Sequence, residues 1–234
     1  MLRLMLFVVC LLPAQISALE ITSTASRTLV VELYTSEGCS SCPPADKWLS
    51  SLKSDSRLFK TLLPLAFHVD YWDQLGWPDP YAKAAYSERQ RELVRQGLLS
   101  QVYTPGLVVN SREWRGWFNG QSLPKQPLSE PGILRAELNN NQLSIFFDSD
   151  ETLTAHIAFL GMGLSSEVEA GENRGRSLVH DFVVLDKRAF DGQGEWQLVL
   201  DERPEAEQQE MALAVWLTKP GSLSVIQAAG GYLE

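Results

Sequence analysis

The sequence predicts an α/β domain at about residues 20–130, followed by a mostly antiparallel β-sandwich domain at about residues 131–234. In the first part, long apolar runs alternate with segments of helical periodicity, as in a sheet with crossover helices. In the second part, short runs rich in β-branched and aromatic residues are separated by polar turns. Residues 123–132 (LPKQPLSEPG) contain three prolines and are typical of a linker.

The elements of the first part follow the order strand, helix, strand, helix, strand. The run TLVVELY is interrupted only by Glu32, which predicts a strand buried on both faces of a parallel sheet. Asp79 and Pro80 suit the N-cap and the first position of a helix. This order implies right-handed crossovers and a parallel core. The expected strands are 28–34, 63–69 and 104–110, and the expected helices are 44–52 and 79–100.

The second part contains seven short apolar runs, which suit an antiparallel sandwich better than helices. The expected strands are 133–138, 143–147, 153–160, 177–185, 195–200, 211–217 and 223–229.

Residues 1–18 predict a secretory signal peptide. One basic residue, Arg3, precedes an apolar core from Leu4 to Leu12, and Ala18 suits a cleavage site. This core is much shorter than the ~20 residues that a membrane-spanning helix needs. We therefore expect a periplasmic or secreted protein, soluble after cleavage and without stable membrane insertion, from which Cys10 has been removed.

The chain is acidic, with a formal net charge of -9 from 29 acidic and 20 basic residues. It has no basic cluster. These features argue against nucleic acid or anionic lipid as a partner.

Cys39 and Cys42 are then the remaining cysteines, and they lie where the first strand meets the first helix. In open α/β sheets, the crevice lies beyond the carboxyl ends of the strands. The loop 70–80 leaves the second strand at the same edge, so both segments should share one face. In an oxidising compartment the two cysteines can form one disulfide. The pair could be a redox centre, half of a metal site or a structural staple.

The first part resembles the thioredoxin superfamily. The resemblance rests on the apolar strand before Cys39-Ser40-Ser41-Cys42, on HVD (residues 68–70) and on Thr104-Pro105. It implies an α/β thioredoxin-like domain in which Pro105 is cis and lies beside the disulfide. It also implies that Thr104 and Pro105 receive the extended backbone of a partner.

A closer resemblance links the chain to a family of secreted thioredoxin-like proteins that is known only as a domain of unknown function. It rests on VVELYTSEGCSSCPPAD, FHVDYWDQLGWPDP and YTPGLVVN, and extends weakly to AGENRGRSLVHDFVV. This resemblance implies a fold but no substrate.

Within this picture, Cys39 is the expected attacking thiol because it leads the motif and should be the more exposed cysteine. Cys42 would be the resolving thiol that closes the disulfide. Glu32 and Asp70 are candidates for proton transfer, although Glu32 lies one residue further from Cys39 than the thioredoxin pattern expects. Exchange with a protein partner requires that the sulfur atoms be accessible.

Three aromatic residues of the loop 70–80 are further candidates. Tyr71, Trp72 and Trp77 could grip a partner's peptide chain, or they could simply cap the edge of the sheet.

The sequence therefore favours an exported thiol–disulfide oxidoreductase that acts on protein thiols or disulfides together with an unidentified redox partner. It would need no cofactor besides the Cys39–Cys42 disulfide. A staple across so short a loop would contribute only about 2 kcal/mol on the chain-entropy formula. One alternative is a copper(I)-binding or metal-delivery module that uses Cys39, Cys42 and His68. The other alternative is a binding protein with an inert disulfide.

Overall fold

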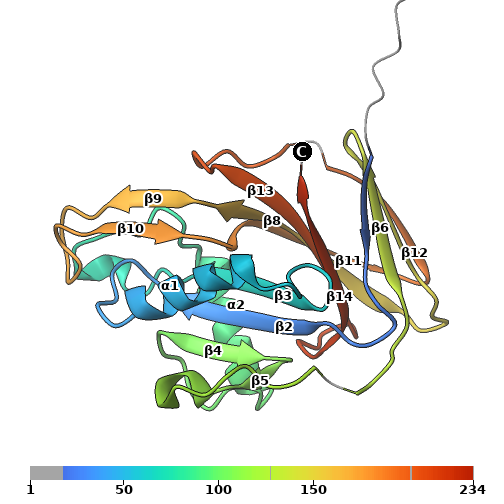
Figure 1. Ribbon diagram of the computed structural model, residues 1–234, viewed down its shortest axis with the longest axis horizontal. Coiled ribbons are helices and arrows are strands. Elements are labelled where there is room, and N and C mark those ends of the chain that lie inside the picture. The colour runs from blue at the N-terminus through green and yellow to red at the C-terminus, as the bar shows by residue number, and fades with distance from the viewer. Residues whose placement is uncertain (1–17, 127, 201, 234) are drawn as a thin grey trace, which may run out of the picture.

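A computed structural model describes residues 18–126, 128–200 and 202–233 (Figure 1). Most regular structure in these residues is β-strand, together with two α-helices and three short 3₁₀ helices. The helices are α1 (Pro43–Ser51), α2 (Ala84–Arg95), η1 (Leu52–Ser54), η2 (Asp73–Leu75) and η3 (Gly116–Asn119). The strands of the first part are β1 (Leu19–Thr22), β2 (Leu29–Thr35), β3 (Leu62–His68), β4 (Gly106–Val109) and β5 (Arg112–Glu113). The later strands are β6 (Leu134–Asn139), β7 (Gln142–Phe147), β8 (Leu153–Met162), β9 (Leu164–Glu167), β10 (Ser177–His180), β11 (Val183–Gly192), β12 (Glu195–Val199), β13 (Glu210–Thr218) and β14 (Val225–Leu233).

One sheet of eight strands runs through the molecule in the order β14-β13-β8-β11-β3-β2-β4-β5. Its central strands β2 and β3 are parallel and buried along their whole length, as their continuous apolar runs predict. β4 pairs antiparallel with β2. On the other side of the pair, β11 joins β3 in parallel through Val183 and Ala66. The sheet therefore combines strands from both parts of the chain.

The predicted fold class, an α/β thioredoxin-like domain followed by a β-sandwich domain, is wrong. The described residues are mostly β-sheet, and no α/β thioredoxin-like arrangement is evident. The prediction failed because β8, β11, β13 and β14 of the second part extend the sheet that begins with β2 and β3. The domain boundary near residue 130 stays a prediction.

A second sheet has four strands in the order β1-β6-β7-β12 and lies at the right in Figure 1. In β6 and β7, buried and exposed residues alternate, because one face of this sheet packs on protein and the other faces water. Its buried face, with Leu143 and Ile145, shares a hydrophobic core with Leu213 and Val215 of β13. Each of the seven runs expected to form strands contains a strand.

The helix α2 begins later than predicted. Its N-cap is Lys83, and Ala84 is its first residue. Asp79 is not an N-cap, because its buried carboxylate accepts hydrogen bonds from the backbone N–H groups of Glu37 and Tyr81 instead. The tertiary partners of Asp79 thus override a local capping pattern.

The strands β9 and β10 form a separate antiparallel pair. In Figure 1 this hairpin extends beyond β8 and β11, and β10 lies on the side of β9 that faces α1. The turn of the hairpin, residues 168–176, is called here the covering loop. It reaches the segment between β2 and α1 that carries the cysteines.

The predicted signal peptide, including Cys10, lies outside the described residues except for Ala18. Within residues 18–126, 128–200 and 202–233, no helix has the length and apolar character needed to cross a membrane.

Candidate functional site

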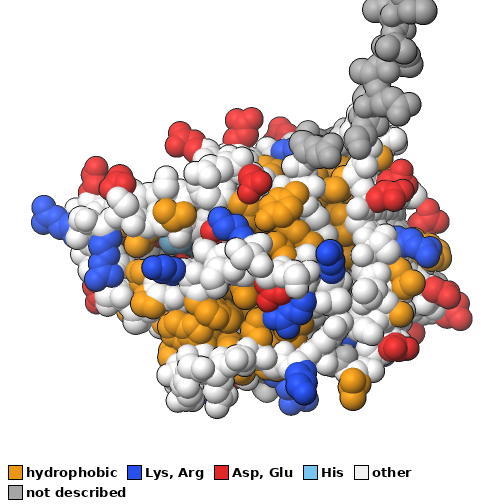
Figure 2. Space-filling view, viewed as in Figure 1, with side chains coloured by type: hydrophobic (Ala, Val, Ile, Leu, Met, Phe, Trp, Pro, Cys, Tyr) orange, Lys and Arg blue, Asp and Glu red, His pale blue; other side chains and the backbone are white. Residues whose placement is uncertain are grey.

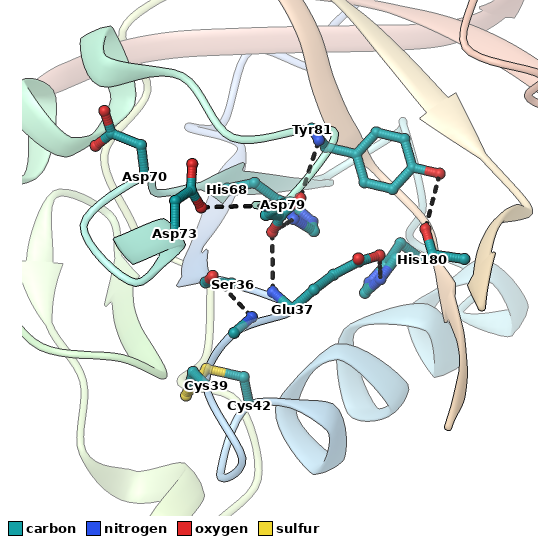
Figure 3. A network of polar contacts seen from close by, with 12 residues as sticks. Ser36, Glu37, Cys39, Cys42, His68, Asp70, Asp73, Asp79, Tyr81 and His180 are labelled. Atoms are coloured by element: carbon teal, nitrogen blue, oxygen red, sulfur yellow. Dashed lines mark hydrogen bonds and ion pairs between the residues drawn. A yellow bond between two sulfur atoms is a disulfide. The ribbon is translucent and has the colours of Figure 1, made fainter. Parts of the chain in front are cut away.

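Cys39 and Cys42 form a disulfide with a Cα–Cα distance of 5.5 Å (Figure 3). This pairing is the one that the sequence predicts. The cysteines lie between β2 and α1, and Cys42 is the N-cap residue of α1. Two prolines follow, and Pro43 begins the helix because its missing N–H would have no intrahelical partner at this position.

Both cysteines are buried, with exposed fractions of 1% for Cys39 and 0% for Cys42. The expectation that Cys39 is exposed is therefore wrong. The two residues between them, Ser40 and Ser41, are exposed. The disulfide is therefore buried, whereas the two serines of the same motif are in contact with solvent.

The covering loop explains part of this burial. The side-chain amide of Asn173 donates hydrogen bonds to the carbonyl oxygens of Cys39, at 3.0 Å, and Glu37, at 2.7 Å. The carboxylate of Glu172 accepts a hydrogen bond from the backbone N–H of Ser40 at 3.1 Å. Asn173 is fully buried whereas Glu172 is exposed, so the loop is anchored by one inner and one outer contact.

The loop between β3 and α2 forms a second wall of the site. A Cβ atom added to Gly38 would lie 2.9 Å from the Cβ atom of Trp72, so only glycine allows this close approach. The indole N–H of Trp72 donates to the hydroxyl oxygen of Thr104 at 2.8 Å. The Thr104–Pro105 peptide bond is cis, as the resemblance implied. Trp72 therefore bridges the cysteine segment and the start of β4.

A buried network of two histidine–carboxylate pairs anchors the cysteine segment from inside (Figure 3). His180 Nε2 lies 3.0 Å from Glu37 Oε1, and His68 Nδ1 lies 2.7 Å from Asp79 Oδ2. The two imidazole rings are nearly perpendicular, with centroids 4.8 Å apart. The second carboxylate oxygen of Glu37 accepts the indole N–H of Trp77 at 2.7 Å. Each carboxylate oxygen of Glu37, two residues before Cys39, therefore has a hydrogen-bond partner.

In the His68–Asp79 pair, each side chain stabilises the charged form of the other. Burial alone would lower the pKa of His68, but the attraction of Asp79 and its hydrogen bond outweigh burial and raise that pKa. Burial alone would raise the pKa of Asp79, but His68 and the backbone donors hold it below its ordinary value. The pair is therefore an internal ion pair at mildly acidic pH.

Asp46, on α1, lies close to the same network. Burial raises the pKa of its carboxyl group, and the nearby His180 and His68 only partly oppose this effect. Asp46 and His180 line a cavity of about 340 Å³ between α1 and β10, which reaches Pro43 beside Cys42. The cavity therefore lies beside the first turns of α1, and neither cysteine is among its lining residues.

The other predicted site residues, Tyr71, Asp70 and Glu32, have hydrogen-bond partners of their own. Tyr71 is half-buried and donates its hydroxyl to Gln90, and burial raises its pKa to about 12. Asp70 accepts a hydrogen bond from the hydroxyl of Ser87, and Figure 3 shows it well away from the sulfur atoms. The carboxylate of Glu32 is buried in the sheet and bound by Arg89 and by the Tyr34 hydroxyl.

The metal alternative gains no support from this arrangement. Among the described residues, no group of three or more histidine, cysteine, aspartate or glutamate side chains is placed to hold a metal ion. His68 uses its Nδ1 atom to bind Asp79, and the two cysteines are joined to each other.

Four residues of the site were not predicted from the sequence to belong to it: Glu37, Asp79, Asn173 and His180. Of these, Asp79 was expected only as a helix N-cap. All four lie within the stretches that carry the resemblance to the secreted family. That resemblance was the available signal, but it did not show which side chains meet.

Fold and site together define a β-rich protein with a buried disulfide between cysteines three positions apart, anchored by a histidine–carboxylate network. The chain belongs to the family described as "Protein of unknown function (DUF1223)", whose model matches residues 30–218. No curated protein matches it.

Solved structures share its fold. The crystal structure of protein AGR_C_4864 from Agrobacterium tumefaciens is 23% identical, with a TM-score of 0.63, over 88% of this chain and 94% of that chain. HBP35 of Porphyromonas gingivalis is 14% identical, with a TM-score of 0.56, over 90% of this chain and 76% of that chain. At such identities these likenesses show the fold alone.

Proposed function

We propose that the protein is an exported thiol–disulfide oxidoreductase that acts on protein partners through Cys39 and Cys42. The observation that carries this proposal is the disulfide itself, which joins the two cysteines across the exposed residues Ser40 and Ser41 at the start of α1. Cysteines in Cys-X-X-Cys motifs and at helix N-termini have lowered thiol pKa values, which favours the reactive thiolate. The predicted signal peptide would deliver the chain to an oxidising compartment.

The exchange would proceed in two steps. The Cys39 thiolate attacks a partner's disulfide, a bond forms between Cys39 and the partner, and the partner's other sulfur leaves as a thiolate. The Cys42 thiolate then attacks the Cys39 sulfur, which forms the intramolecular disulfide and releases the partner's second thiolate. Two electrons pass to the partner, and its two thiolates take up the two protons that Cys39 and Cys42 gave up. A dithiol-class redox partner restores the reduced pair, and the same steps run backwards oxidise a partner's dithiol.

A structural role explains the disulfide less well. A loop closed between residues three positions apart contributes only about 2 kcal/mol to stability on the chain-entropy formula. The segment is already held by Asn173, by Asp79 and by the partners of Glu37. A further covalent staple adds little to a segment with so many other contacts.

The burial of both cysteines defines what a partner must do. It must displace the covering loop, whose direct hydrogen bonds to the segment Cys39–Ser40 are those of Asn173 and Glu172. The cavity beside Pro43 gives room for part of the partner. Figure 2 also shows hydrophobic side chains gathered between α1 and β4, and such patches favour protein partners. The ring centroids of Trp48 and Trp114 lie 5.7 Å apart.

The decisive experiment captures partners in the native compartment. A Cys42→Ala variant keeps the attacking thiol but cannot release a partner, so it should accumulate mixed disulfides that dithiothreitol cleaves. A Cys39→Ala variant should form none, and it should lose disulfide reductase and oxidase activity. Ser122→Ala, which changes an exposed side chain outside the site, should behave as wild type. If Cys42→Ala captures no more than Cys39→Ala does, the cysteines are spectators and the protein binds by other means.

A further inference from the structure

The strand β10 has one edge that pairs with no other strand. Its partner is β9, and within the described part of the chain these two strands form a sheet of their own. In Figure 1, the edge of β10 that points away from β9 faces α1. An unpaired strand edge offers its backbone N–H and C=O groups to a further strand.

The pairing register shows which backbone groups of β10 lie at this free edge. The N–H of Val168 donates to the carbonyl oxygen of Arg176 at 3.0 Å, just before β10 begins. From there, non-hydrogen-bonded and hydrogen-bonded pairs alternate along an antiparallel ladder. Ser177 and Val179 therefore belong to non-hydrogen-bonded pairs, so their N–H and C=O groups point away from β9. No hydrogen bond joins these four groups to another described residue.

The cavity of about 340 Å³ between α1 and β10 makes this edge accessible. It is called here the edge groove. One wall is the strand β10 together with Asp181, and the other wall is one face of α1, whose residues follow helical spacing. Ser177 and Val179 both line the groove and are exposed, Val179 to 56%. The residues that α1 contributes are Pro43, Asp46, Lys47 and Ser50.

The edge strand β12 of the second sheet differs in this respect. The cavity that reaches β12, of about 460 Å³, is lined by Glu195 and otherwise by residues of β1, β6 and β7. It therefore lies over the sheet and not between a strand edge and a helix. This difference makes β12 a suitable comparison for β10.

We propose that the edge groove binds an extended segment of a protein partner, which adds to β10 as a third strand of the β9–β10 sheet. The backbone groups of Ser177 and Val179 hold the segment by main-chain hydrogen bonds, as in other cases of strand addition. A β-branched or aromatic residue of the segment packs beside the exposed Val179. Pro43, which follows Cys42, lines the same groove, so the bound segment passes near the disulfide. The inference goes beyond the exchange reaction, because the backbone of β10 provides the hydrogen bonds.

The test uses the oxidised mature protein and a probe without thiols, so that no exchange reaction contributes. The probe is fluorescein-labelled lactalbumin, reduced and carboxymethylated so that it stays unfolded and offers extended segments. Fluorescence anisotropy should show saturable binding. Val179→Pro removes one N–H from the free edge, and it should weaken binding by about tenfold or more. The strand should tolerate this proline, because the lost N–H is not part of the ladder with β9.

Val199→Pro is the matched control. Val199 is 52% exposed on the edge strand β12, and the N–H of Leu200 donates to the carbonyl oxygen of Asn141 at 2.7 Å. Val199, which lies opposite Gln142, therefore also belongs to a non-hydrogen-bonded pair. This variant should bind the probe as tightly as wild type.

Amide hydrogen exchange gives a second measurement on the unmodified protein, which matters if a variant fails to fold. The bound probe should slow exchange at the N–H groups of Ser177 and Val179 by about tenfold or more, and should leave Val199 unchanged. The proposal is overturned if the probe does not bind saturably, if Val179→Pro binds like Val199→Pro, or if exchange at Ser177 and Val179 stays the same. Partner capture by Cys42→Ala tests the exchange reaction separately, so the two proposals can fail independently.

Discussion

The side-chain amide of Asn173 donates a hydrogen bond to the carbonyl oxygen of Cys39, 134 positions away in the chain, at 3.0 Å. A residue of the β9–β10 turn thereby binds the segment that connects β2 to α1. The disulfide and its cover come from distant parts of the sequence. This contact therefore links the covering loop directly to the backbone of Cys39.

Removing the Asn173 side chain should make the disulfide easier to reduce. Asn173→Ala deletes two hydrogen bonds, and each contributes about 1 kcal/mol to stability. We expect the rate of reduction by dithiothreitol to rise about tenfold or more, since 1.4 kcal/mol corresponds to a factor of ten. Asn119→Ala, at an exposed position of η3, is the matched control. Equal rates for the two variants would show that the covering loop does not limit access.

Asp79→Asn should destabilise the protein most at mildly acidic pH. The raised pKa of His68 contributes stability below its ordinary value of 6.5, and this contribution disappears as pH rises through the native pKa. The lowered pKa of Asp79 contributes stability above its ordinary value of 3.8, and this contribution is lost as pH falls through the native pKa. The contribution of the pair is therefore largest between these two ordinary values.

Breaking this buried pair should cost about 3 kcal/mol of unfolding free energy near pH 5.5. Urea unfolding of wild type and Asp79→Asn between pH 4 and 9 measures the difference at each pH. Glu151→Gln, which breaks an exposed pair with Lys219, should change stability little at any pH. A difference for Asp79→Asn that grows as pH rises above 7 would contradict the assigned ion pair.

Glu32→Gln should cost about 3 kcal/mol or more, because it leaves the guanidinium of Arg89 buried without a counter-charge. The double variant Glu32→Gln, Arg89→Met should recover much of this loss, since replacing a whole buried pair by apolar groups is often neutral. Urea unfolding checks both. If Glu32 served only in proton transfer, the single variant would change reactivity at Cys39 and Cys42 while leaving stability intact.

Replacing both cysteines should cost little stability. For the double variant Cys39→Ala, Cys42→Ala, we expect a loss of about 2 kcal/mol relative to the oxidised protein, as the short loop implies. Chemical denaturation of the two proteins under identical conditions gives the difference. A loss far above this value would favour the inert staple over a redox centre.

Part of the fold was predictable because it depends on local composition. The strands β2 and β3 follow from continuous apolar runs, and β6 and β7 follow from alternating ones. Strand partners were not predictable, because the contact of Val183 with Ala66 joins residues more than a hundred positions apart. No local pattern specifies such a pairing. The sequence analysis therefore assigned the strands of one continuous eight-stranded sheet to two separate domains.

The candidate site shows the same division. Cys39 and Cys42 could be paired from their spacing and predicted compartment, but their burial could not be foreseen. Asp79 followed by Pro80 has the pattern of a helix start, yet its carboxylate binds His68 and the backbone of Glu37 instead. Its neighbours in space, which the local pattern does not include, decided its role.

The sequence by itself determined the order of strands and helices and which two cysteines could join, because periodicity and spacing are local properties. Only the tertiary structure decided that Asn173 lies over Cys39 and that Glu37 meets His180. The physical reason is that buried polar groups must find hydrogen-bond partners wherever the folded chain brings them, however far apart they are in sequence.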